Sequence, residues 1–267
     1  MEQKKNNFKI VADKKSARIL LPNILTLVGV CIGLTSIRFA LSGEFHLSII
    51  AIIFAALIDG LDGRIARLIK GTSKVGKELD SLTDMISFGV APAFIMYFWK
   101  LNTLGRFGWL LCLIYVICVA LRLARFNVNS NQEPSWKDNF FEGVPSPAGG
   151  ILVLTPLIIS LSGFDYVQLD YDIITPVFFI VTSFLLISKI PSYSFKKIVI
   201  QRKTTIFLLF SIVLFFGLLL IYTFEVIAVS SIIYLSLLPI SIFHYRKIKK
   251  IHENENTQDD DNLEDEL

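Results

Sequence analysis

Long apolar runs constrain the fold of this chain more than any other feature of its sequence. Eight runs come close to the length of about 20 residues that a helix needs to cross a lipid bilayer. They cover residues 19–41, 46–69, 78–99, 106–126, 148–163, 172–189, 204–222 and 225–245. The 267 residues are 53% hydrophobic, with a mean hydropathy of +0.60, which is too apolar for an ordinary soluble domain. We therefore expect an all-α, polytopic membrane protein with about eight transmembrane helices.

Basic residues alternate between the two ends of these runs. Of the 26 Lys and Arg residues, all but Arg38, Lys100 and Arg106 lie at the N-terminus, near the second, fourth and sixth connections, or after residue 245. Cytoplasmic segments of membrane proteins carry an excess of Lys and Arg. The pattern therefore places both termini on the cytoplasmic side of a cell (inner) membrane, as an even number of spans requires.

The expected spans divide the chain into four parts. Residues 1–18 form a basic cytoplasmic segment, and residues 19–203 hold the first six helices with a candidate site at their cytoplasmic face. Residues 204–245 form the last two helices, for which we expect contacts with lipid or with a second subunit. Residues 246–267 are first basic and then strongly acidic, which predicts a disordered tail.

Small residues and two prolines predict three local features of the first and third helices. Gly29 and Gly33 form a small-xxx-small pair, which indicates a close packing seam between helices. Pro22 suits the first turn of a helix. Pro92 is expected to kink the third helix.

Four aspartates flank the connection between the second and third helices. Asp59 and Asp62 are three residues apart, and Asp80 and Asp84 are four apart, so each pair lies on one face of its helix. Carboxylates that face one another repel strongly unless a cation lies among them. Hard divalent cations such as Mg²⁺ or Mn²⁺ prefer such oxygen ligands. The sequence therefore predicts a metal site at the cytoplasmic ends of these helices.

The residues between the two aspartate pairs suit a phosphorylated substrate. Ala66 and Gly76 lie on the aspartate stripes and are small enough to let the two helices approach closely. Basic residues there can pair with phosphate. They are Arg64, Arg67, Lys70, Lys74 and Lys77.

The spacing of this segment, D-x2-D-G-x2-A-R-x8-G-x3-D-x3-D from Asp59 to Asp84, resembles the signature of the CDP-alcohol phosphatidyltransferase family at every fixed position. The resemblance implies a metal-dependent transferase that uses two divalent ions, Mg²⁺ or Mn²⁺. It assigns Asp59, Asp62 and Asp80 as metal ligands. Asp84 would contribute to the metal site and act as the general base on the acceptor hydroxyl, because an alcohol is a weak nucleophile until its proton is being removed. The residues implied around the CDP moiety are Asn23, Thr26, Asp62, Gly63, Ala66 and Arg67.

Further motifs resemble the branch of this family whose acceptor alcohol is L-serine. They are PNILT at 22–26, DSLTDMISFGVAPA at 80–93, LRLARFN at 121–127, GVPSPAGG at 143–150 and SKIPSYSFK at 188–196. The resemblance implies that CDP-diacylglycerol and L-serine react to give phosphatidylserine and CMP, and that the protein is a homodimer. Arg122 and Arg125 are candidates for a cationic clamp on serine, and Ser146 for shaping the serine pocket.

Two other functions fit parts of the sequence. The same chemistry could use another acceptor, such as glycerol 3-phosphate or an inositol phosphate, which would require an additional basic pocket. A divalent-cation transporter or channel would also use intramembrane aspartates, but the cluster lies at one membrane face beside basic residues that disfavour cation passage. We expect membrane lipid, and no nucleic acid, among the partners.

Overall fold

The computed structural model describes residues 14–69, 71, 73–129, 140–163, 170–193 and 202–264. Most of the basic segment expected at residues 1–18 lies outside this part of the chain. The helices and strands are α1 (Lys14–Leu41), α2 (Phe45–Leu68), α3 (Lys74–Asp84), α4 (Ala91–Trp99), α5 (Arg106–Asn129), β1 (Phe140–Glu142), α6 (Ser146–Leu161), α7 (Tyr171–Ile187), β2 (Pro191–Tyr193), α8 (Arg202–Ile221) and α9 (Thr223–Glu264). A π-helical stretch, Met85–Val90, joins α3 to α4, and a short 3-10 turn, Leu101–Leu104, joins α4 to α5.

The apolar helices agree with the expected membrane spans. Five segments are long and apolar enough to cross a membrane: Leu20–Leu41, Phe45–Leu68, Lys74–Trp99, Arg106–Val128 and Thr223–Tyr245. The three shorter apolar helices are Ser146–Leu161, Tyr171–Ile187 and Thr205–Ile221. Together they lie within a few residues of the eight apolar runs. The chain is a multi-pass integral membrane protein, and the expected fold class is confirmed.

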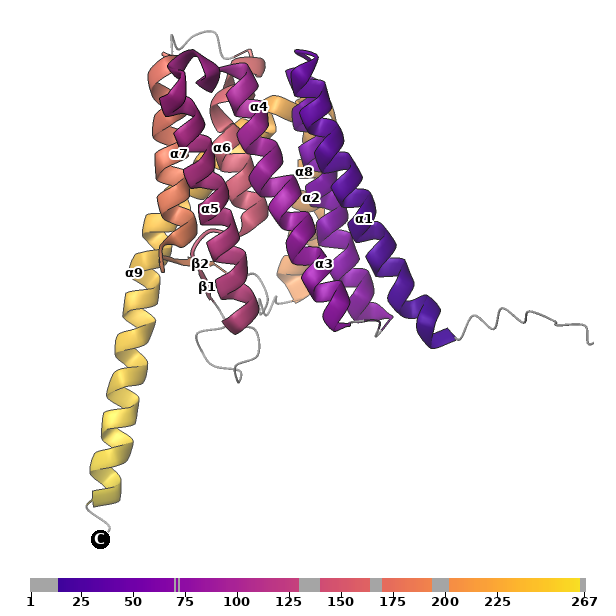
Figure 1. Cartoon of the computed structure of the whole chain (residues 1–267). Coiled ribbons are helices and arrows are strands. Elements are labelled where there is room, and N and C mark those ends of the chain that lie inside the picture. The colour runs from indigo at the N-terminus through magenta and orange to yellow at the C-terminus, as the bar shows by residue number, and fades with distance from the viewer. Residues whose placement is uncertain are drawn as a thin grey trace, which may run out of the picture.

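The helices run side by side along one common direction, and α9 extends well beyond the others (Figure 1). The described start of α1 and the described end of α9 lie at the same end of the bundle, as an even number of crossings requires. The turn between α2 and α3 also lies at this end, so the aspartates beside that turn are near one end of the bundle.

A glycine seam joins α1 to the helix that carries Asp80 and Asp84. A Cβ on Gly33 would lie 2.6 Å from Ser87 Oγ, and a Cβ on Gly29 would lie 3.3 Å from Thr83 Cγ2. The seam therefore leaves no room for a side chain at Gly33 and little room for one at Gly29. This confirms the expected packing role of the glycine pair.

The irregularity expected at Pro92 takes the form of the π-helical stretch before it. Pro92 has no N–H, so it cannot donate to the carbonyl of Phe88 four residues earlier. The Tyr115 hydroxyl on α5 donates to that carbonyl instead, over 2.6 Å, and Tyr115 is fully buried. A buried carbonyl without a partner would destabilise the fold, so this contact compensates for the proline.

The core lies between α2, α4, α5, α6 and α7, around the large buried side chains of Tyr115, Phe88 and Phe179. By contrast, α8 exposes apolar side chains around nearly its whole circumference. A helix that is apolar on all sides suits contact with lipid.

Helix α9 is not only lipid-facing. Its Leu238 is buried against Val144 and Leu152, beside Tyr234. The last apolar helix therefore covers part of α6 and of the segment that precedes it.

A short two-stranded sheet was not anticipated from the sequence. Strands β1 and β2 pair antiparallel, with Phe141 opposite Ser192, and so connect the segment before α6 to the segment after α7. Between β1 and α6, Gly143 has a φ of +77°, and its N–H donates to the carbonyl of Ile190 over 2.9 Å. The left-handed backbone favours glycine, and a Cβ there would lie 2.8 Å from the carbonyl oxygen of Ser188.

Two helix ends differ from the expected boundaries. Helix α1 begins at Lys14, so Pro22 lies inside it and not in its first turn. Helix α9 continues to Glu264, although residues 246–267 were expected to be disordered. No glycine or proline interrupts residues 240–264, so nothing in the local sequence ends the helix after the apolar run.

Candidate active site

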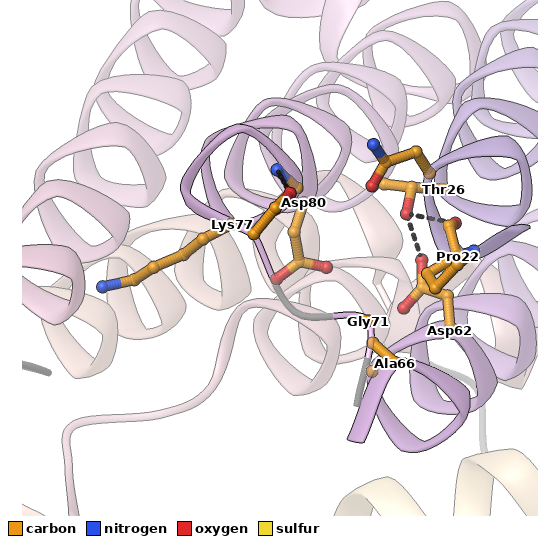
Figure 2. Close-up of a pocket in the computed structure, with 11 residues that line it drawn as sticks. Pro22, Thr26, Asp62, Ala66, Gly71, Lys77 and Asp80 are labelled. Atoms are coloured by element: carbon orange, nitrogen blue, oxygen red, sulfur yellow. Dashed lines mark hydrogen bonds between the residues drawn. The ribbon is translucent and has the colours of Figure 1, made fainter. Parts of the chain in front are cut away.

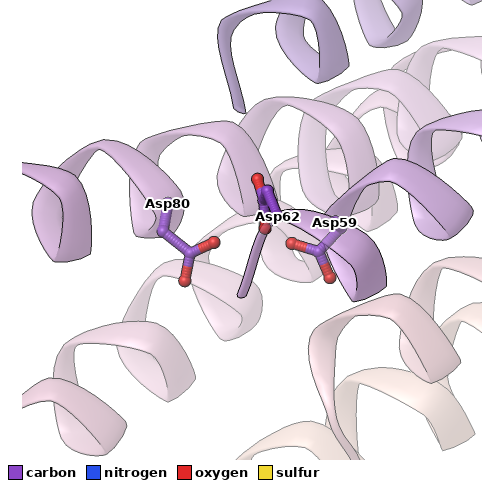
Figure 3. Close-up of side chains that lie close together, drawn as sticks. All are labelled: Asp59, Asp62 and Asp80. Carbon is purple, nitrogen blue, oxygen red and sulfur yellow. The ribbon is translucent and has the colours of Figure 1, made fainter. Parts of the chain in front are cut away.

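Three of the four aspartates meet where α2 and α3 come together. Asp59 and Asp62 project from the last turns of α2, and Asp80 projects from α3 (Figure 3). One carboxylate oxygen of each lies within 4.8 Å of the other two. The sequence spacing therefore predicted this convergence correctly.

Asp62 is held in place by α1. The Thr26 hydroxyl lies 2.7 Å from Oδ2 of Asp62 and 3.0 Å from the carbonyl oxygen of Pro22, and both Thr26 and Asp62 are buried. The other carboxylate oxygen, Oδ1 of Asp62, is buried and has no hydrogen-bond partner in the described part of the chain. One oxygen is thus fixed by the protein, and the second is left available for a ligand.

Asp84 occupies a different position from the other three aspartates. It is the last residue of α3, and it lies near enough to Asp59 for the two carboxylates to interact electrostatically. Its Oδ2 accepts a hydrogen bond from Ser146 over 2.7 Å. Its Oδ1 is buried and, among the described residues, has no partner. Asp84 therefore links the aspartate cluster to the first turn of α6.

This donor set fits a hard divalent cation. The cluster offers carboxylate oxygens, and two buried oxygens, one on Asp62 and one on the adjoining Asp84, have no hydrogen-bond partners among the described residues. Unpaired buried acceptors are costly, and carboxylates this close repel one another unless a cation lies between them. Mg²⁺ and Mn²⁺ both prefer oxygen ligands, so the residues fit the expected metal without selecting one of the two.

A cavity of about 180 Å³ adjoins the cluster (Figure 2). It is lined by Pro22, Asn23, Thr26, Asp62, Gly63, Ala66, Gly71, Ser73, Gly76, Lys77 and Asp80. All but one of the residues expected around the CDP moiety are in this set. The exception is Arg67, which is exposed and donates from Nε to the carbonyl of Gly63 on its own helix over 3.1 Å.

Small residues make the cavity possible. A Cβ on Gly76 would lie 2.9 Å from Asn23 Oδ1 and 3.1 Å from Ser73 Oγ. Ser73 also begins α3, because its side chain accepts a hydrogen bond from the N–H of Gly76 over 2.9 Å. Gly76 therefore has two roles: its N–H caps the start of α3, and its lack of a side chain leaves room for Asn23.

The three residues expected around serine lie in two different environments. Arg122 is buried, and its Nη1 donates to Ser146 Oγ over 3.0 Å, which places it beside Asp84. Arg125 instead donates to the carbonyls of Ile187 and Ser188, over 2.8 and 3.4 Å, at the end of α7. The structure thus brings Arg122 and Ser146 to the site, and it does not bring the guanidinium of Arg125 there.

A family model described as CDP-alcohol phosphatidyltransferase matches residues 19–187. The chain belongs to this family. The match covers α2 and α3 with all four aspartates and ends at the last residue of α7, so the family's helices build the whole cluster.

Curated relatives of this phosphatidyltransferase extend over most of its length. It is similar to the CDP-diacylglycerol–serine O-phosphatidyltransferase of Mycobacterium leprae, with 36% identity over 234 residues, or 85% of this chain and 76% of the relative. The protein of the same name from Helicobacter pylori is 33% identical over 216 residues, covering 81% of this chain and 88% of the relative. That from Bacillus subtilis is 33% identical over 177 residues, covering 66% and 92%.

Sequence reasoning missed one residue and one contact around the site of this phosphatidyltransferase. Ser73 lines the cavity, and its signal was its place as a helix-capping residue directly after the turn. Lys77 had been grouped with the basic run, but its side chain extends away from Asp62 (Figure 2). Its Nζ lies 3.3 Å from the carbonyl oxygen of Asn127 on α5. No sequence pattern indicated that contact, because it joins residues 50 positions apart.

Proposed function

We propose that this chain is a phosphatidylserine synthase that transfers the phosphatidyl group of CDP-diacylglycerol to the hydroxyl of L-serine and releases CMP. The observation that carries the proposal is the convergence of the carboxylates of Asp59, Asp62 and Asp80 beside a cavity lined by most of the residues expected around the CDP moiety. The choice of L-serine as the acceptor rests on the relatives that are named for this reaction.

The four aspartates have different roles in the proposed reaction. Asp59, Asp62 and Asp80 would hold the divalent ions, which we take to be Mg²⁺ or Mn²⁺ and two in number. When bound, these ions supply charge that stabilises the diphosphate and the CMP leaving group. Asp62 is preoriented for this role, because the Thr26 hydroxyl fixes one of its oxygens.

The nucleotide end of the substrate would occupy the cavity between α1, α2 and α3. Gly63, Ala66 and Gly76 leave room there, and Asn23 offers an amide to a polar ligand. Arg67 does not line the cavity; its Nε binds its own helix, and its Nη groups carry the donors that could pair with phosphate.

The acceptor end would lie on the other side of the cluster, at Asp84. As general base, Asp84 takes the proton of the serine hydroxyl through Oδ1, the oxygen that Ser146 does not occupy. Arg122 is the group placed to receive the serine carboxylate, since its Nε is buried and has no partner among the described residues. Arg125 takes no direct part in this arrangement, because it binds the end of α7.

We further propose that the protein is a homodimer of the inner membrane, with the site and both termini on the cytoplasmic side. The distribution of Lys and Arg supports the orientation, and the position of both described ends at one end of the bundle agrees with it (Figure 1).

The test is a comparison of acceptors with identification of the lipid product. Purified protein in liposomes receives CDP-diacylglycerol, Mg²⁺ or Mn²⁺, and either L-serine, glycerol 3-phosphate or an inositol phosphate. We expect phosphatidylserine with L-serine and no lipid product with the phosphorylated acceptors. A product formed only with a phosphorylated acceptor would keep the family chemistry and overturn the serine assignment.

A matched aspartate variant controls this test. Asp59→Asn alters the cluster, whereas Asp172→Asn alters an aspartate that pairs with Lys100 over 3.1 Å and takes no part in the site. We expect product formation to be lost in Asp59→Asn and retained in Asp172→Asn.

A further inference from the structure

The first turn of α6 is fixed against the segment that follows Asp84. Ser146 and Gly150 are four residues apart on α6, and Asp84 and Phe88 are four apart on the facing segment. Ser146 contacts Asp84, and a Cβ on Gly150 would lie 3.2 Å from Cβ of Phe88. The two contacts set the register between the helices, so Ser146 can meet Asp84 only in this arrangement.

Helix α5 fixes the same segment from its other side. Tyr115 binds the carbonyl of Phe88, and a Cβ on Gly89 would lie 3.2 Å from Cγ1 of Val119. One turn further along α5, Arg122 reaches Ser146. Tyr115, Val119 and Arg122 lie on one face of α5, so the position of Arg122 follows from the same packing.

The chemistry of these groups fixes the direction of each hydrogen bond. A guanidinium can only donate, so Ser146 Oγ accepts from Arg122 Nη1. The single hydroxyl proton of Ser146 is then directed to Oδ2 of Asp84, 2.7 Å away. Ser146 is 1% exposed, so water does not compete for either bond. The Asp84 carboxylate is therefore held by one oxygen, and the other oxygen, Oδ1, has no partner among the described residues.

We propose that Ser146 is a positioning residue for Asp84: its hydroxyl, oriented by Arg122, holds Oδ2 so that Oδ1 faces the acceptor hydroxyl. This rests on the proposed function and assigns Ser146 a role other than contact with serine. The arrangement fixes the side-chain rotation of the base before the acceptor arrives. A base that must find its orientation during the reaction is less effective than one already in place.

The first test separates turnover from affinity in Ser146→Ala. We expect kcat to fall by about 10- to 100-fold, because the base loses its orientation, while KM for L-serine stays within about twofold. Ser162→Ala is the matched control, since Ser162 is a buried serine at the opposite end of α6 whose hydroxyl binds the carbonyl of Ile159. Its kcat should match that of the unaltered protein. A raised KM with unchanged kcat in Ser146→Ala would make Ser146 a ligand of serine and overturn the proposal.

The second test does not depend on activity. Melting temperatures in detergent are measured for Ser146→Ala, Asp84→Ala and the double variant. If Ser146 binds Asp84, the two shifts are not additive, because each substitution removes the same bond. Additive shifts would overturn the positioning role and leave the proposed function standing. Failure of the unaltered protein to use L-serine would overturn the proposed function. The melting temperatures would still show whether Ser146 and Asp84 interact.

Discussion

The Thr26 hydroxyl lies 2.7 Å from Oδ2 of Asp62 and ties α1 to the carboxylate cluster on α2 and α3. The contact joins residues 36 positions apart and is buried. It gives α1 a part in the site, although α1 contributes no aspartate to it. The outer partners of metal-binding side chains orient those side chains and tune the affinity for the metal.

Removal of the Thr26 hydroxyl should therefore weaken metal binding. We expect Thr26→Val to raise the Mg²⁺ or Mn²⁺ concentration needed for half-maximal CMP release by about 10- to 100-fold, and Thr26→Ser to restore most of the affinity. Thr155→Val is the control, because Thr155 is buried and binds only the carbonyl of Ile151 among the contacts shown. An unchanged metal requirement in Thr26→Val would contradict the orienting role.

The glycine seam, which packs α1 against α3 and the π-helical stretch after it, should tolerate no side chain at Gly33. Gly33→Ala would place a methyl group 2.6 Å from Ser87 Oγ and should destabilise the protein by about 1–3 kcal/mol, measured as a lower melting temperature in detergent. The matched variant is Gly217→Ala in α8, where a Cβ would meet nothing within 4 Å. It should leave the melting temperature unchanged or raise it, since alanine favours helix more than glycine does. Equal melting temperatures for the two variants would argue against the close contact.

The two arginines of α5 should differ in their effects. Arg122→Ala removes the proposed partner of the serine carboxylate and should raise KM for L-serine by about 10-fold or more, because hydrogen bonds to charged groups contribute about 1.5–3 kcal/mol. It also removes the donor that orients Ser146, so kcat should fall as well. Arg125→Ala removes a cap from α7 and should cost about 0.3–1 kcal/mol of stability with KM unchanged. Titration of L-serine in both variants checks this. A large KM increase in Arg125→Ala without loss of stability would restore the original clamp hypothesis.

Removal of the divalent metal should be reversible. Chelation is expected to abolish CMP release, and added Mg²⁺ or Mn²⁺ should restore it in the unaltered protein. In Asp80→Asn the restoration should require far more metal, because the cluster loses one of its three converging carboxylates. Turnover that survives full chelation would contradict a metal-dependent reaction.

Local patterns in the sequence were sufficient to predict the membrane-spanning helices and the aspartate cluster. Apolar run lengths predicted the spanning helices within a few residues, because helix length in a bilayer is set by its thickness. The spacing of Asp59, Asp62 and Asp80 predicted their convergence, because helical periodicity fixes which residues share a face. The glycine pair of α1 predicted a close seam for the same reason, although the sequence did not name Thr83 and Ser87 as the opposite side.

Contacts between distant segments could not be predicted in this way. Arg122 and Arg125 have the same charge and lie three residues apart, yet one reaches Ser146 and the other the end of α7. That difference depends on how α5 packs against α6 and α7. Pro92 shows from the sequence alone that the carbonyl of Phe88 loses its usual helical donor. The sequence does not show that the Tyr115 hydroxyl on α5 binds this carbonyl instead. The pairing of β1 with β2 joins segments separated by two helices.

Transfer of label from L-serine into lipid would test directly whether this protein makes phosphatidylserine. Purified protein in liposomes is given CDP-diacylglycerol, divalent metal and labelled L-serine, and labelled phosphatidylserine and CMP are followed together, with Asp84→Asn as the comparison. We expect equal amounts of both products, dependence on metal, and loss of both in Asp84→Asn. Folded protein that binds metal but forms neither product with any acceptor would contradict the proposed function, and metal flux across the liposomes would then favour a transporter.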